Sequence, residues 1–178
     1  MYEVPRMQLI PQDQTNACWY ASALMLLQWS RSGELMSHST DSLISPVANP
    51  IITATYRANN VLLWTEMKRT ALQLGMREMP LATPSPAELE RWFRLYGPVW
   101  TDGFPVNSAG QAVGTGHVVV LAGIRASSLP GESYDLKVYD PWPPNVGNIS
   151  WRPSSHLSAI TEGVASNPGR NVCFLVKS

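Results

Sequence analysis

The sequence predicts an α+β fold in which a helical N-terminal half precedes an antiparallel β-sheet. Three observations support this prediction. An apolar helix pattern begins near Cys18, and further helix patterns follow as far as Gly97. Beyond Gly97 the pattern changes to short apolar strands, which are separated by clusters of Gly, Pro, Asn and Ser. Helices first and strands second are typical of a domain that segregates its helices from an antiparallel sheet.

The chain has 178 residues, and we expect residues 1–178 to form a single domain. Hydrophobic residues make up 44% of the sequence, which is close to the usual share for a packed core. Charged residues make up only 15%, whereas the 15 prolines and 12 glycines indicate many loops and turns.

The formal net charge is zero, with 13 basic and 13 acidic residues and no run of Lys or Arg. This balance gives no electrostatic source for binding to nucleic acid or to an anionic membrane. The longest apolar stretches, such as residues 118–122, are far shorter than the ~20 residues that cross a bilayer. The first ten residues lack the basic and apolar regions of a secretory signal. We therefore expect a cytoplasmic protein, or one exported by another route.

The first helix is predicted to begin near Cys18, to run to Trp29 and to end before Gly33, with Thr15 or Asn16 as its N-cap. It is apolar around nearly its whole circumference, which predicts a buried central helix. The residues before it read as extended chain, because two X-Pro steps disfavour helix there.

Residues 34–58 read as irregular, because Pro46 and Pro50 break any long element. A second helix is predicted from Asn60 to Leu74, with the following glycine as its C-terminal stop.

A third helix is predicted after Ser85, which suits the N-cap position. Pro86 fits the first helical position, and Glu88 completes a capping box. The helix is expected to stop at Gly97. The predicted strands that follow cover residues 99–101, 117–124, 134–139, 148–151 and 172–176.

The chain has two cysteines, Cys18 and Cys173, which are too few for a disulfide framework or a zinc site. Cys173 lies in an apolar strand pattern and is expected to be a buried, inert thiol. A disulfide between the two cysteines would close a very long loop. Cys18 lies at a helix start, where free N–H groups and the helix dipole favour a thiolate. Cys18 is therefore a candidate nucleophile, with a packed, inert cysteine as the alternative.

His117 and Asp140 are candidate partners of this thiol. His117 opens the strongest apolar strand pattern, where an imidazole can act as base to a thiol. Asp140 ends the next strand. If the two strands pair, its carboxylate can reach the imidazole and fix its tautomer, although an Asp-Pro turn is the simpler interpretation. The other two histidines, His38 and His156, are expected on the surface.

Gln12 is a candidate oxyanion-hole residue. It lies six residues before Cys18 in the loop that leads into the helix. An amide there can donate, together with the Cys18 backbone N–H, to the oxyanion of an acyl transfer. We expect Gln12→Ala to slow acylation and barely change folding. Gln14 is a competing candidate, and either residue can be a solvated loop residue.

These motifs together resemble the papain-like cysteine peptidases. The motifs are Gln12 ahead of a Cys-Trp pair at 18–19, a His-initiated strand within residues 116–123, and Asp-Pro-Trp at 140–142. The resemblance looks closest to the small bacterial branch, which includes papain-like protease effectors of plant-pathogenic bacteria and bacteriocin-processing peptidase domains. Asp in place of the Asn common in plant and animal enzymes, and no Gly-rich run around the nucleophile, argue against a lysosomal cathepsin.

The resemblance implies a papain-like fold, with the Cys on the buried central helix of an N-terminal helical lobe and a C-terminal antiparallel sheet lobe. It implies a catalytic Cys18, His117 and Asp140, an oxyanion-hole donor Gln12, and supporting Trp19 and Trp142. In such enzymes the Trp at this place shields the His–acid hydrogen bond from water.

The implied function is hydrolysis of peptide bonds through an acyl-thioester on Cys18, with no cofactor. The expected partners are a protein or peptide substrate and an inhibitory immunity protein. The protein is expected to be a monomer and to act as a delivered effector or toxin. Three alternatives stay open, namely a glutamine deamidase acting on proteins, a cell-wall peptide amidase or endopeptidase, and a non-catalytic binding module.

Overall fold

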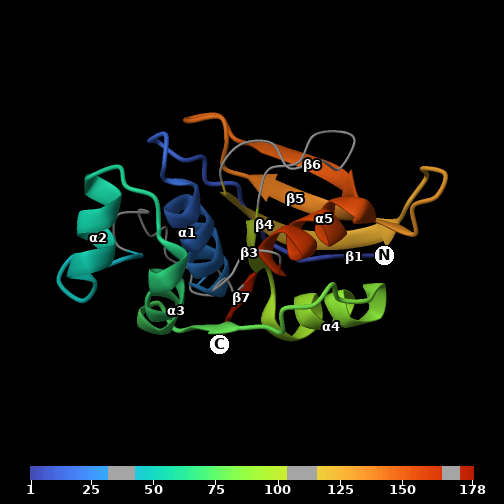
Figure 1. Ribbon diagram of the computed structural model, residues 1–178, viewed down its shortest axis with the longest axis horizontal. Coiled ribbons are helices and arrows are strands. Elements are labelled where there is room, and N and C mark those ends of the chain that lie inside the picture. The colour runs from blue at the N-terminus through green and yellow to red at the C-terminus, as the bar shows by residue number, and fades with distance from the viewer. Residues whose placement is uncertain (32–42, 104–115, 166–172) are drawn as a thin grey trace.

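The computed structural model describes residues 1–31, 43–103, 116–165 and 173–178 (Figure 1). The helices in these ranges are α1 (Cys18–Arg31), α2 (Pro50–Arg57), α3 (Trp64–Gln73), α4 (Pro86–Tyr96) and α5 (Ser154–Ala165). The strands are β1 (Tyr2–Glu3), β2 (Met76–Glu78), β3 (Val99–Gly103), β4 (His117–Ala126), β5 (Tyr134–Asp140), β6 (Asn148–Pro153) and β7 (Phe174–Lys177). Helices α1 to α3 gather at one end of the molecule and the sheet fills the other, so the α+β prediction is confirmed.

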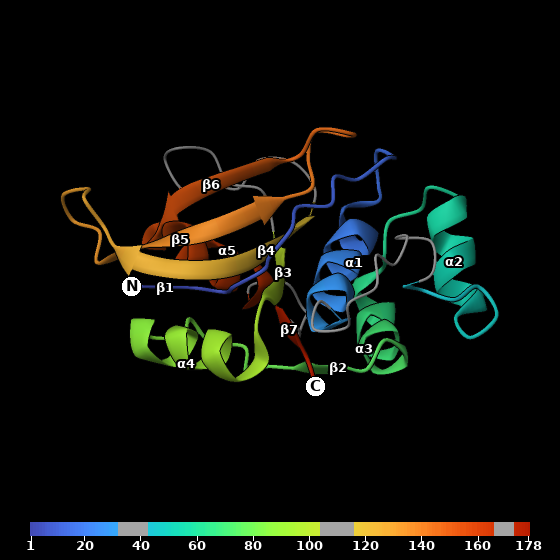
Figure 2. The same ribbon diagram turned by 180° about the vertical axis from the view of Figure 1, so that it is seen from behind.

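The strands form one sheet in the order β2-β7-β3-β4-β5-β6, and every pairing is antiparallel. The short β1 also pairs with β4, and Figure 2 shows it running along that strand. Strand β3 pairs with residues 117–121 of β4, whereas β1 pairs with residues 123–124. Strands β3 and β1 therefore succeed each other along one edge of β4, which is the longest strand described.

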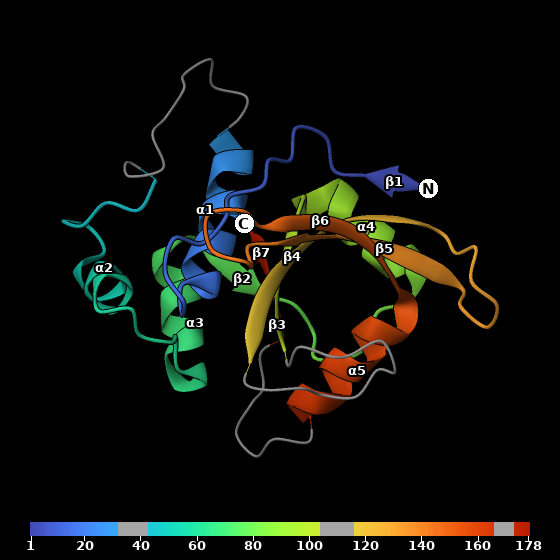
Figure 3. The same cartoon turned by 90° about the horizontal axis from the view of Figure 1, so that it is seen from above.

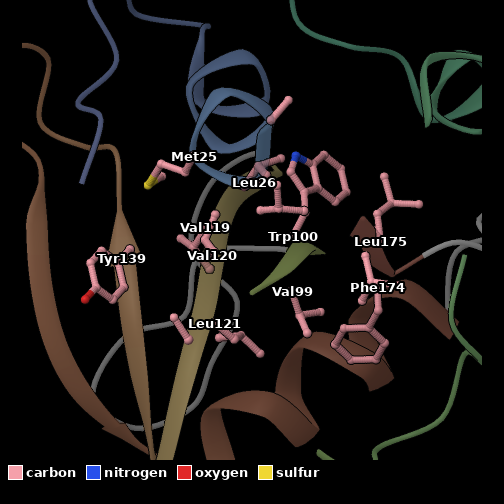
Figure 4. Close-up of a cluster of buried hydrophobic side chains, with 14 of the residues drawn as sticks. Met25, Leu26, Val99, Trp100, Val119, Val120, Leu121, Tyr139, Phe174 and Leu175 are labelled. Atoms are coloured by element: carbon pink, nitrogen blue, oxygen red, sulfur yellow. The ribbon is translucent and has the colours of Figure 1, made fainter. Parts of the chain in front are cut away.

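The sheet is buried on both faces around β3, β4 and β7. Trp100, Val120 and Leu175 are cross-strand partners on one face, which α1 covers (Figure 4). The Trp100 ring nitrogen donates to the backbone carbonyl of Trp19 in α1 at 3.2 Å. Phe174 lies on the opposite face, where its ring meets that of Trp92 in α4 edge to face. Burial on both faces explains why β4 is apolar without alternation.

Helices α1 and α4 were predicted correctly. Nine consecutive residues of α1, from Trp19 to Leu27, are buried, as expected for a central helix. Helix α4 begins at Pro86, and Ser85 and Glu88 form the predicted reciprocal capping box.

The predicted irregular segment 34–58 is wrong for residues 50–57, which form α2; residues 32–42 lie outside the described ranges. Pro50 does not break a helix there but starts one, because a first helical residue needs no N–H partner. Helix α3 begins at Trp64, four residues later than predicted, because Leu63 is extended.

The N-cap predicted for α1 is also wrong. The helix begins at Cys18, which places Ala17 before it, and the Asn16 side-chain nitrogen donates to the carbonyl of Asn59 instead.

Three described elements were not predicted, namely β1, β2 and α5. The first two are short, with two and three residues. Helix α5 begins with Ser-Ser-His after a proline, which reads as a loop. Its signal was the spacing of Leu157, Ile160 and Val164, whose side chains are all buried. Among the described helices, none is long and apolar enough to cross a membrane.

Candidate active site

Three elements place Cys18, His117 and Asp140 at one end of the sheet. Antiparallel pairing of β4 with β5 brings the first residue of β4 near the last residue of β5. Ser22, one turn after Cys18, anchors helix α1 here. The Ser22 hydroxyl donates to the backbone carbonyl of Val118 at 3.4 Å. Residues four apart share one face of a helix, so this bond holds Cys18 beside the start of β4.

His117 lies between Asp140 and Cys18. Its Nε2 lies 2.7 Å from Oδ1 of Asp140, and the two side chains are only 20% and 11% exposed. The Cys18 side chain lies near enough to the imidazole to raise the pKa of His117. Because Asp140 occupies Nε2, Nδ1 is the nitrogen that remains for Cys18. The pairing of β4 with β5, on which the contact between His117 and Asp140 depends, is present.

The charges of these groups reinforce one another. Burial lowers the pKa of His117, but the hydrogen bonds to Asp140 and Cys18 and their charges outweigh it and raise the pKa to about 9. Burial raises the pKa of Asp140, but the bond and charge of His117, the Trp142 amide and the charge of Arg152 together lower it. At neutral pH the pair is therefore an imidazolium and a carboxylate.

Arg152 and His156 belong to the same cluster, and neither was a sequence candidate. Arg152 lies on β6, and its Nη2 donates to Oδ2 of Asp140 at 2.8 Å. His156, on α5, was expected on the surface; it is partly buried and lies 3.2 Å from Nη1 of Arg152. Burial and then the charge of Arg152 lower its pKa to about 4. The pairing of β6 with β5 brings Arg152 to Asp140. The sequence alone does not specify the register of that pairing.

The neutral His156 predicts a specific sensitivity to acid. Below pH about 6.5 the unfolded chain binds a proton at this residue, whereas the folded protein resists it until about pH 4. Stability present above this window is therefore lost as the pH falls through it. We expect His156→Gln, which cannot take up a proton, to lose less stability across the window than the wild type. Urea midpoints measured through the window check this, and equal losses would contradict a neutral His156.

Gln12 lies beside the segment that follows Asp140, and it is buried rather than solvated. Its side chain is 1% exposed, and Nε2 donates to the carbonyls of Gln14 and Thr15 at 2.7 and 2.9 Å. Its backbone bonds Pro141 and Asn145, which follow Asp140. Its Oε1 is buried without a partner in the described part of the chain. The expectation that Gln12→Ala barely changes folding must be revised, because Gln12 holds the loop together.

The two supporting tryptophans differ. Trp19 is fully packed, and its ring nitrogen donates to the carbonyl of Asn60 at 3.1 Å. The Trp142 side chain is 46% exposed, and the bond recorded for this residue runs from its backbone N–H to Oδ1 of Asp140 at 3.0 Å. The contribution of residue 142 to the acid therefore comes from its backbone.

The loop before Cys18 is fastened to the end of α2. The backbone N–H of Asn16 donates to the side chain of Asn59 at 3.0 Å. The Tyr56 hydroxyl donates to Asp13, and its ring stacks on Tyr20 with centroids 3.9 Å apart. Burial and the bond to Asp13 raise the pKa of Tyr56 to about 12. These contacts fix the position from which Cys18 starts the helix.

Neither Cys18 nor Cys173 forms a disulfide. Cys173 is fully buried, as predicted, whereas Cys18 is partly exposed. Within the described residues, no three His, Cys, Asp or Glu side chains form a metal-binding cluster.

A two-lobed α+β fold that carries a Cys at the start of its central helix, beside a His–Asp pair on the adjoining strands, defines the papain-like class. The chain belongs to the family described as papain-like cysteine protease AvrRpt2, whose family model matches residues 1–154. The match spans every sequence candidate from Gln12 to Trp142 and also Arg152, and it confirms the resemblance to the bacterial effector branch of papain-like peptidases. A comparison with curated proteins gave no match.

Proposed function

We propose that the protein hydrolyses peptide bonds in a protein substrate, with Cys18 as nucleophile, His117 as acid and base, and Asp140 as the group that orients His117. Membership of a cysteine protease family supports the reaction class. The observation that carries the assignment is the 2.7 Å contact between His117 and Asp140, together with the effect of the Cys18 side chain on the pKa of the same imidazole.

In the proposed reaction, the Cys18 sulfur attacks the carbonyl carbon of the scissile bond and forms a tetrahedral oxyanion. The oxyanion collapses as the C–N bond breaks, and the proton on His117 passes to the leaving amine. With a pKa of about 9, His117 holds this proton at neutral pH. Water then attacks the acyl-thioester carbonyl while His117 takes one of its protons. Collapse of this second tetrahedral intermediate breaks the C–S bond, releases the acid and returns the Cys18 sulfur beside a protonated His117, as at the start.

The backbone N–H of Cys18 is the first donor proposed for the oxyanion. Cys18 is the first residue of α1, where N–H groups have no partner within the helix. Gln12 is the second proposed donor. Both hydrogens of its Nε2 are directed at carbonyls, so one of them must be shared with the oxyanion when it forms.

We expect Gln12→Ala to lower the acylation rate by roughly 10²–10³-fold. It should also destabilise the fold by about 1–3 kcal/mol, because the buried Gln12 side chain loses both of its hydrogen bonds, to the carbonyls of Gln14 and Thr15. Pre-steady-state cleavage and urea unfolding measure the two effects separately. Gln14→Ala is the control; if it slows acylation while Gln12→Ala does not, the oxyanion hole has been assigned to the wrong glutamine.

The surface beside the proposed triad suits a polypeptide. Trp142 and Val146 follow Asp140 closely in the chain, and both residues are exposed. Such apolar side chains next to a catalytic centre can pack against substrate side chains.

The biological role that the resemblance supports is that of a delivered effector or toxin. An inhibitory protein in the producing cell is the partner that we propose to accompany it.

The experiment that tests the function presents three substrate classes and measures masses. Proteome-derived peptides, muropeptides and intact glutamine-containing proteins are incubated with the protein, with Cys18→Ala as the control. A protease produces new peptide termini. Release of muropeptides or side-chain deamidation would instead favour the wall hydrolase or the deamidase, and an unchanged mixture would favour a binding module.

A further inference from the structure

Asp140 is held on both of its oxygens. Oδ1 accepts from Nε2 of His117 and from the backbone N–H of Trp142, at 2.7 and 3.0 Å. Oδ2 accepts from Nη2 of Arg152 at 2.8 Å. We propose that Arg152 is a positioning residue that fixes Asp140 with one oxygen toward His117, and that His156 fixes Arg152 in turn. This inference rests on the proposed role of Asp140 in the reaction.

The register of the sheet explains how Arg152 reaches the acid. On β6, Asn148 pairs with Asp140, Ser150 with Val138 and Arg152 with Leu136. These alternate residues lie on one face of the two strands, so Arg152 points to the same side as Asp140. Its side chain extends along β6 past Ser150, whose hydroxyl accepts from Nε at 3.4 Å. Only a long side chain can reach Asp140 from this position on β6.

His156 supplies the third contact of the guanidinium. Nη1 of Arg152 lies 3.2 Å from Nε2 of His156 on α5. Arginine can only donate, so this imidazole nitrogen must be the acceptor and the ring must be neutral. All three guanidinium nitrogens are then engaged, by β5, β6 and α5. A planar guanidinium held at three nitrogens cannot turn without breaking a bond. The Asp140 carboxylate that it binds is therefore held in one orientation.

A second ion pair, which shares only strand β5 with the first, lacks these features. Arg125 of β4 bonds Asp135 of β5 through Nε alone, at 3.1 Å, and the other Asp135 oxygen is buried without a partner in the described residues. This pair has the same chemical groups and lies at the opposite end of β5 from Asp140. It is therefore a matched control for a salt bridge that only supports the fold.

The test compares Arg152→Met with Arg125→Met, using a peptide taken from the cleavage screen. We expect Arg152→Met to lower kcat about 10–100-fold, the size known for outer-shell partners of metal ligands, with KM little changed. We also expect the acid limb of its activity profile to move up by about one pH unit or more, because the carboxylate loses an adjacent positive charge. Arg125→Met should lower the melting temperature but leave kcat and the acid limb as in the wild type.

His156 is tested by two further variants. His156→Gln keeps an acceptor for Arg152 and should retain most of kcat. His156→Leu removes the acceptor and should lower kcat and shift the acid limb in the same direction as Arg152→Met. Equal behaviour of the two variants would overturn the assignment of His156.

Asp140→Asn distinguishes failure of this inference from failure of the proposed function. If Asp140→Asn is inactive but Arg152→Met keeps the kcat and acid limb of the wild type, the role of Arg152 is wrong and the triad stands. If Arg152→Met and Arg125→Met lower kcat equally, Arg152 only supports the fold and the inference is also wrong. If Asp140→Asn is fully active, Asp140 orients nothing and both proposals fail.

Discussion

Cys18→Ala is expected to abolish peptide cleavage and to leave the fold intact. The substitution removes the sulfur that forms the acyl-enzyme, so no slower version of the same pathway remains. Its structural cost is small, because Cys18 is partly exposed at the first position of α1 and alanine favours helix. Activity against the identified peptide and the melting temperature, measured on one preparation, check both statements.

Cys173→Ala is the matched control for this prediction. Cys173 is fully buried next to β7, so its loss leaves a cavity and should lower the melting temperature. It lies in no contact proposed for the reaction, so activity below that temperature should persist. Iodoacetamide should likewise label Cys18 before Cys173. If Cys173→Ala is the inactive variant, or Cys173 reacts first, Cys18 is not the nucleophile.

Asp140→Asn is expected to lower kcat/KM by roughly 10²–10⁴-fold, with the upper value taken from the corresponding change in a serine triad. Asparagine removes the charge beside His117. It also cannot serve both neighbours, because Arg152 and His117 approach the two oxygens of Asp140 as donors and an amide has only one oxygen. We therefore expect the pKa of His117 to fall from about 9, since the bond to Asp140 is its largest raising cause. Histidine NMR titration measures this fall.

The same titration has a consequence for stability. The folded protein holds the His117 proton up to about pH 9, whereas an unfolded histidine releases it near 6.5. The stabilisation is therefore complete below pH 6.5 and is lost as the pH rises through 9. In Asp140→Asn this loss should shrink. Asp135→Asn, on the same strand but bonded to Arg125, should leave the His117 titration unchanged; a fall as large as that of Asp140→Asn would contradict a direct effect of Asp140.

The sequence predicted the parts of the fold whose signals are local. The capping box at Ser85 and Glu88 and the stop at Gly97 depend on neighbouring residues, and the structure has them as predicted. Segment 50–57 failed because a proline has opposite meanings in the middle of a helix and at its first residue. Helix α5 (Figure 3) was hard to predict because it lies between β6 and β7 in the chain and packs against β3, β5 and β6, which breaks the simple order of helices before strands.

The candidate site likewise contains residues with local sequence signals and residues that depend on distant contacts. Cys18, His117 and Asp140 could be selected because each stands at the end of an element with a clear pattern. Arg152 could not, because its meaning depends on the register of β6 against β5, which no residue near it specifies. Gln12 was placed in the right loop, but its burial follows from bonds to the chain after Asp140, which is far away in the sequence. Contacts between distant segments were therefore the missing information.

The most direct test of the central claim is the intact mass of the protein during turnover. The protein is mixed with a cleaved peptide, quenched in acid within the first turnover, and weighed. We expect an added mass equal to the acyl part of the peptide. It should map to Cys18, be absent in Cys18→Ala and be diminished in Asp140→Asn. Peptide cleavage that proceeds with no adduct on Cys18, and that persists in Cys18→Ala, would contradict it.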